Sequence, residues 1–243
     1  MKLSRVFVAV VALCTTAAFA EVGKVAALEG EATRTAKDGG ATEALKLGSL
    51  IELGDTLTVK AGNLKFELND GTVIMLAPAS VLEITKADFE GQERKGFQGL
   101  LKGGSLWTKV KKALGAGEFE VSTERAVAGV RGTIFRIDAD ALVKAAKGKG
   151  RKASIVRVLE GAVAVNPTKK IIATMKGAVP KPKGPRVEVA GPKELSGPDE
   201  WEKVFVTLQA NQQIAVGEDL WDQAQIEEAA KKDAFSKWIE KNQ

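Results

Sequence analysis

The sequence contains no histidine and no tyrosine, and its single cysteine, Cys14, lies among the first twenty residues. Without histidine or a later cysteine, residues 21–243 cannot form the usual zinc and copper ligand sets or the Ser–His and Cys–His catalytic triads. They cannot form a disulfide either, so stability must come from a packed core, which an apolar content of 44% can supply. Carboxylate, lysine or serine–lysine catalysis would remain possible, but no paired carboxylate motif and no S-x-x-K motif in the right context occurs. We therefore expect no metal, no cofactor and no enzymatic activity.

Long hydrophobic runs are also missing, and the longest stands at the start of the chain. Lys2 and Arg5 precede an apolar stretch at 6–13, which ends in the small-x-small triplet 18–20. This order is typical of a secretory signal peptide. A membrane anchor needs about 18 apolar residues, and a lipoprotein signal at Cys14 would need a small residue before it. We expect cleavage after Ala20, a periplasmic or secreted product, and no membrane span after cleavage.

Short alternating runs separated by glycine-bearing turns fill residues 22–165. Leu64, Phe66 and Leu68 alternate with polar residues, as expected of a half-buried strand. The triplet Asn69-Asp70-Gly71 follows directly, and such a triplet between two strands predicts a tight turn. Many short strands at this spacing predict an all-β sandwich, barrel or solenoid.

Two segments interrupt this pattern. Residues 139–153 are rich in lysine and arginine, and we expect a long basic loop with a short helical start at 141–146. Residues 167–200 hold six of the seven prolines, counting Pro167, and predict a linker or wrapping loop. Residues 201–243 predict final strands and a C-terminal α-helix that begins at Asp219 as N-cap. The predicted units are a signal peptide at 1–20, a β domain at 21–166, the linker, and this C-terminal part.

The order of the turn motifs resembles that of the FecR domain, the periplasmic ligand- or partner-sensing domain of iron-citrate-type signalling regulators. The resemblance spans about residues 45–166 and implies a β-rich, solenoid-like or sandwich domain without catalytic activity. Regulators of this family carry a cytoplasmic sigma-factor-contacting domain and a transmembrane helix, whereas a signal peptide stands here, so we expect an exported FecR domain. The residues that carry the motifs are Gly54, Asp55, Asp70, Gly71, Gly129, Arg131, Gly132, Thr133, Glu160 and Gly161.

Arg131 stands between Gly129 and Gly132 at the start of an apolar strand. A guanidinium group suits carboxylate and phosphate ligands, so Arg131 is a candidate ligand-binding cation. The alternative is structural, because glycine on both sides suits a crowded turn and a partly buried arginine must be paired. We favour the structural role, with Asp70 or Glu160 as the partner.

Further candidate binding residues are all basic. Nucleic acid is not an expected partner, because the signal peptide predicts export and aromatic residues for base stacking do not interleave with the basic tracts. An anionic envelope polymer or an acidic protein suits these charges better, while a solvated loop without a partner is the simplest alternative. The candidates are Arg125, Lys144, Lys147, Lys149, Arg151 and Lys152.

Two functions follow from the sequence. The first is an exported, non-catalytic FecR-like module that recognises an envelope protein or ligand. The alternative is a structural protein of the cell envelope that binds an anionic wall polymer through its basic loops.

Overall fold

The strands of the chain form a single hydrogen-bonded sheet in the computed structural model. The structure describes residues 21–112, 117–143, 150–174, 206–218, 220–225 and 233–243. The predicted signal peptide and most of the predicted linker lie outside these residues. No helix within the described ranges is long and apolar enough to cross a membrane.

The described elements are mostly strands, as predicted. They are β1 (Glu21–Thr35), the 3₁₀ turn η1 (Lys37–Gly39), β2 (Thr42–Ala44), β3 (Leu50–Glu52), β4 (Thr56–Leu68), β5 (Val73–Leu76), β6 (Ser80–Glu90), β7 (Glu93–Gly103), β8 (Ser105–Lys109), β9 (Glu118–Ser122), β10 (Ala126–Val130), β11 (Ile134–Val143), β12 (Arg151–Glu160), β13 (Ala162–Pro167), α1 (Lys169–Thr174), β14 (Val206–Gln209), β15 (Gln212–Gly217), β16 (Leu220–Gln225) and α3 (Ala234–Asn242).

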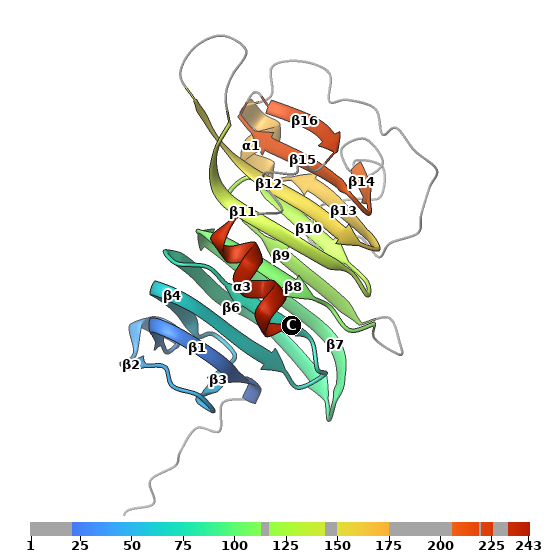
Figure 1. Cartoon of the computed structure of the whole chain (residues 1–243). Helices are drawn as coiled ribbons and strands as arrows, with labels where there is room; N and C mark the ends of the chain where they lie inside the picture. The colour runs from blue at the N-terminus through green and yellow to red at the C-terminus, as the bar shows by residue number, and fades with distance from the viewer. Residues whose placement is uncertain (1–20, 113–116, 144–149, 175–205, 219, 226–232) are drawn as a thin grey trace, which may run out of the picture.

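The sheet of 16 strands is curled into a half-barrel (Figure 1), and β4 stands in the middle of the strand order. The first part of β4 pairs with β6 and the second part with β5, while β1 pairs along nearly its whole length. Two wings therefore start from β4. The first wing continues through β6, β7, β9, β10, β13 and β14, and the second through β5, β8, β11, β12, β15 and β16.

Consecutive segments of the chain extend the two wings in turn. After β8 in the second wing the chain crosses to β9 and β10 in the first, returns to β11 and β12, and crosses again to β13 and β14. Each crossing is a short segment that connects an antiparallel strand pair in one wing to an antiparallel strand pair in the other. Among the described strands, only β7 and β9 pair in parallel. The short linking segments are therefore brought together at the ends of the strands.

The period-2 alternation correctly predicts which residues form the core. Leu64, Phe66 and Leu68 are buried on the inner face, and Phe119 stacks on Phe97 with ring centroids 4.8 Å apart. The glycine of the predicted tight turn, Gly71, has a φ of 80°, which is the conformation that favours glycine there.

Two predicted helices differ from the structure. Residues 141–143 continue β11 instead of starting a helix, because they pair with the beginning of β12. Residues 220–225 form β16, paired with β15, so the C-terminal helix does not begin at Asp219. The helix α3 begins after Asp233, whose carboxylate accepts a hydrogen bond from Ser236 N at 2.7 Å. Trp221, predicted for the helix, instead packs against the main core from the sheet.

Candidate functional site

The FecR-like motifs meet at one end of the strands. We define the crossover edge as residues 70–72, 110–112, 131–133 and 160–162. The backbone N–H of Lys111 donates to Thr72 Oγ1 at 3.1 Å, and Val110 N donates to Thr133 O at 2.9 Å. Thr133 Oγ1 then donates to Ala162 O at 2.9 Å. Segments that are far apart in the sequence are thus hydrogen-bonded in series along this edge.

Two motif glycines are required by this close packing. Gly132 has a φ of 62°, and a Cβ there would lie 3.1 Å from Lys112 Cβ. Gly161 has a φ of 82°, and a Cβ there would lie 3.0 Å from Thr133 Oγ1. A larger residue at either position would combine backbone strain with a tight contact that the neighbouring side chain must shift to relieve.

A buried arginine from β7 ties the first turns of the edge together. Arg94 is 1% exposed and forms an ion pair with the Asp70 carboxylate through NH1. The same nitrogen donates to Thr72 Oγ1 at 2.9 Å, and NH2 donates to Lys111 O at 3.1 Å. Asp70 also accepts from Thr72 N and Thr72 Oγ1, each at 2.9 Å. A buried charge is tolerated only when it is paired and hydrogen-bonded in this way.

The surroundings of Arg94 are largely apolar. Its guanidinium carbon lies 5.3 Å from the centroid of the Phe119 ring, and its Nε is buried without a hydrogen-bond partner among the described residues. Burial lowers the pKa of Arg94, and the nearby Asp70 carboxylate opposes that shift. The group stays charged at neutral pH, because arginine is by far the most basic of the side chains.

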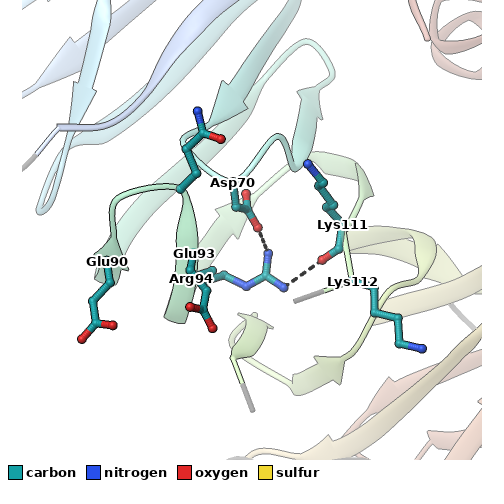
Figure 2. A pocket seen from close by; sticks show the side chains of 7 residues that line it. Asp70, Glu90, Glu93, Arg94, Lys111 and Lys112 are labelled. Carbon is teal, nitrogen blue, oxygen red and sulfur yellow. Dashed lines mark hydrogen bonds and ion pairs between the residues drawn. The ribbon is translucent and has the colours of Figure 1, made fainter. Parts of the chain in front are cut away.

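A cleft of about 360 Å³ opens above this pair (Figure 2). Lys111 and Lys112 contribute one side, and neither forms an ion pair within the described part of the chain. The β6–β7 hairpin contributes the other side through Glu90, Gln92 and Glu93. Lys95 pairs with Glu90 at 3.0 Å and with Glu93 at 3.2 Å, so it offsets one of their two negative charges. The two lysines are consequently the cations available to an anionic group in the cleft.

Arg131 does not have the position that the sequence analysis predicts for it. It lies on the crossover edge but is solvent-exposed, and the expectation of partial burial is wrong. Of the two partners predicted for it, Asp70 and Glu160, Asp70 is instead paired with Arg94. Gly129 lies within the β10 ladder, opposite Ala164 and Glu120.

The other candidate cations lie at the opposite ends of the strands. We define the opposite edge as residues 77–80, 103–105, 123–125, 139–140 and 151–154. Arg125 lies there and pairs with Asp140 at 3.1 Å and with Glu124 at 3.4 Å. Arg151 and Lys152 are exposed at the start of β12. Lys144, Lys147 and Lys149 lie outside the described residues. The structure therefore separates Arg131 from Arg125 by the length of β10 and does not combine them in one site.

Two further motif groups are structural. Asp55 is 1% exposed and accepts from Glu52 N at 2.9 Å and from Arg34 NH1 at 3.4 Å. Gly54 before it has a φ of 92°. Glu160 is exposed at the end of β12, next to Gly161.

The sequence analysis missed Arg94. It occurs in the charged stretch Glu90–Lys95, which reads as an exposed hairpin, and no local signal distinguishes it from its neighbours. Alternation within β7 would even place Arg94 on the face opposite to the buried Phe97, because Arg94, Gly96 and Gln98 share one parity while Phe97 has the other. A bulge in the β6–β7 pairing between Asp88 and Phe89 breaks that parity.

Comparison with protein families shows which family the region around the cleft belongs to. The model of the family described as "FecR protein" matches residues 55–164. Residues 55–164 form a FecR domain. The matched span includes Asp70, Arg94, Lys111 and Lys112, so the cleft belongs to the FecR domain. No curated protein matches the chain.

Two solved structures resemble the fold at a distance. Both are crystal structures of a proposed anti-sigma factor from Parabacteroides distasonis ATCC 8503, at 1.65 and 2.50 Å resolution. Each aligns with a TM-score of 0.45 at 19% identity and covers 76% of this chain. The alignments span 64% and 63% of those chains.

Proposed function

We propose that this protein is an exported, non-catalytic FecR-like module that recognises an envelope protein or ligand through the cleft at the crossover edge. The observation that carries the proposal is the position of Lys111 and Lys112, which form no ion pair with any described residue, above the buried Arg94–Asp70 pair. The buried pair fixes the turn that presents the lysines, since Arg94 donates to the carbonyl of Lys111 itself.

The chemistry of the cleft favours an anionic group on the ligand. A carboxylate or phosphate between two ammonium groups gains charge-assisted hydrogen bonds. The lysines lie on a turn that is hydrogen-bonded on both sides, so little ordering is needed on binding, which favours affinity. Glu90 and Glu93 on the facing hairpin would repel a second anionic group. A bound ligand would therefore be oriented with its anionic group toward the lysines.

Export and the finer fold description belong to the same proposal. The n-region, apolar stretch and small-x-small triplet of residues 1–20 support a cleaved signal peptide and a periplasmic or secreted location. The alternate extension of the two wings supports a sandwich with solenoid character. The alternative function, binding of an anionic wall polymer through basic loops, has less support, because Arg125 is already paired with carboxylates.

Capture from an envelope extract tests the proposal. We expect the full chain, immobilised on beads, to retain a specific protein or ligand, and the double variant Lys111→Ala/Lys112→Ala to retain at least tenfold less. The matched control is Lys60→Ala/Lys102→Ala, which removes two exposed lysines that pair with Glu31 and Glu83 away from the cleft. Equal capture by both double variants would contradict the role of the cleft.

A further inference from the structure

A second apolar cluster lies on the face of the sheet that points away from the main core. Met75, Ala77 and Trp107 contribute from β5, the segment after it, and β8, and they pack with Phe235, Trp238 and Ile239 of α3. Figure 1 shows α3 lying across the sheet. Their neighbours in the strands, such as Ile74 and Leu106, belong to the main core on the other face. The outer cluster is therefore separate from the core that holds the two wings together.

The sheet residues under α3 form one cross-strand row. In register, Lys65 of β4 stands opposite Met75 of β5, Met75 opposite Trp107 of β8, and Trp107 opposite Arg136 of β11. The next member of the row is Arg157 of β12. The row thus has an apolar middle between a lysine at one end and arginines at the other.

The helix α3 runs along this row. Arg136 NH1 lies 2.6 Å from the Asp233 carboxylate at the start of α3, and Lys65 Nζ donates to the Asn242 carbonyl at its end. Nine helical residues span about 13 Å at 1.5 Å per residue. Three strand spacings from β4 to β11 span about 14 Å. The length of the row therefore matches the length of the helix.

The charges of the row suit one helix direction. Lys65 meets the carbonyl end of α3, where the helix dipole is negative, and Arg136 meets an acidic N-cap. Arg136 is also positioned by Asp138 at 2.9 Å, lies 5.3 Å from the Phe235 ring centroid, and donates to Ser236 Oγ at 3.2 Å. The row consequently recognises an acidic residue, two aromatic residues and an aliphatic residue on one helix.

The docking of α3 on the sheet is less stable than the sheet itself. A helix of nine residues is too short to be stable without packing. The Nε1 of Trp238 is buried without a hydrogen-bond partner among the described residues, which disfavours the docked helix. The main core does not include α3, so the sheet keeps its own core when the helix leaves.

We propose that the row Lys65–Met75–Trp107–Arg136 is a helix-binding site, that α3 is its resident occupant, and that a partner protein's amphipathic helix can replace it. The fitting helix has an acidic N-cap followed by the aromatic, aromatic and aliphatic pattern of Phe235, Trp238 and Ile239. This surface lies apart from the cleft at the crossover edge and does not depend on the function proposed for it.

Native-state hydrogen exchange on the unaltered full chain gives the first test. We expect the α3 amides to be at least a hundredfold less protected than those of β8, because α3 opens without unfolding of the sheet. Equal protection of α3 and β8 would show that the helix is a fixed part of the core and would overturn the proposal.

Peptide binding gives the second test. The full-chain variant Phe235→Ala/Trp238→Ala loosens the resident helix, and we expect it to bind a fluorescent peptide of residues 233–243 at least tenfold more tightly than the unaltered chain does. The same peptide with Asp233→Lys should bind at least tenfold more weakly, because it repels Arg136. Absence of saturable binding in a variant whose β8 amides remain protected contradicts the proposal, and so does a dimer of the unaltered chain that exchanges α3 between copies. If the variant loses protection of its β8 amides, it has unfolded, and native-state hydrogen exchange on the unaltered chain is then the test of the proposal.

Discussion

The two ends of the sheet carry similar numbers of basic side chains but use them differently. At the opposite edge Arg125 pairs with Asp140 and Glu124, and Glu124 also binds Lys170. At the crossover edge one arginine, Arg94, is buried on Asp70, and Lys111 and Lys112 line a cleft without ion pairs in the described residues. Where the carboxylates are placed decides which cations remain available to a ligand.

Burial differs between the two ends as well. Arg94 is wholly buried, so removing it leaves an unpaired charge, whereas Arg125 keeps 12% of its side chain exposed and its partners more. The opposite edge is instead fixed by hydroxyl groups, with Thr123 and Ser154 hydrogen-bonded at 2.8 Å. A buried ion pair and a buried hydroxyl pair should respond to mutation with different magnitudes.

Arg94→Ala should have the largest effect. The Asp70 carboxylate would remain buried with only Thr72 to satisfy it, so we expect a loss of about 3–5 kcal/mol in the free energy of unfolding. Urea denaturation measures it, with Lys95→Ala, an exposed neighbour, as the control that should change stability by less than about 0.5 kcal/mol. A loss below about 1 kcal/mol for Arg94→Ala would mean that the pair does not hold the edge.

Thr123→Val should have an intermediate effect at the other end. Thr123 Oγ1 accepts from Arg125 N at 3.1 Å and from Ala126 N at 2.9 Å, and valine leaves these buried groups without a partner. We expect a loss of about 1–3 kcal/mol by the same assay. Thr85→Val, which removes an exposed hydroxyl, is the matched control. Indistinguishable stabilities of the two variants would show that the opposite edge is held by other contacts.

Arg131→Ala tests the correction made by the structure. Because Arg131 is exposed, we expect its removal to change the free energy of unfolding by about 0.5 kcal/mol or less. A loss comparable to that of Arg94→Ala, measured side by side, would restore the structural role inferred from the glycines around it.

Glu124→Gln should give the smallest effect, and one that depends on pH. The hydrogen bond and charge of Lys170, together with Arg125, hold the pKa of Glu124 below its usual value. A carboxyl with a lowered folded-state pKa stabilises the fold above its unfolded pKa of about 4.3 and loses that contribution as the pH falls through the folded value. The pair is exposed, so we expect about 0.3 kcal/mol at pH 7 and no difference at pH 2. A difference that grows toward acid would contradict the sign.

The sequence predicts the fold class well because its signals are local. Alternation identifies Leu64, Phe66 and Leu68 as core residues, and the tight turn at Asp70–Gly71 follows from the conformational freedom of glycine. The C-terminal helix was predicted too early because β16 is a strand only through its pairing with β15, a contact that helical spacing does not reveal.

The cleft could not be predicted from the sequence for a similar reason. Arg94, Asp70 and Lys111 come from three separate segments, and nothing around Arg94 indicates that it is buried. The motif glycines draw attention to Arg131, yet the same turn geometry that requires Gly132 places Arg131 on the surface. Which arginine meets Asp70 depends on the order of strands in the sheet.

One measurement tests the central claim most directly: capture from envelope extract by Lys111→Ala/Lys112→Ala and by Arg151→Ala/Lys152→Ala, compared with the unaltered chain in the same experiment. The first variant removes the two lysines that line the cleft, and the second removes two described cations of the opposite edge. We predict at least a tenfold loss for the first and retention by the second. Retention by the first with loss by the second would contradict the account and favour binding through the basic loop.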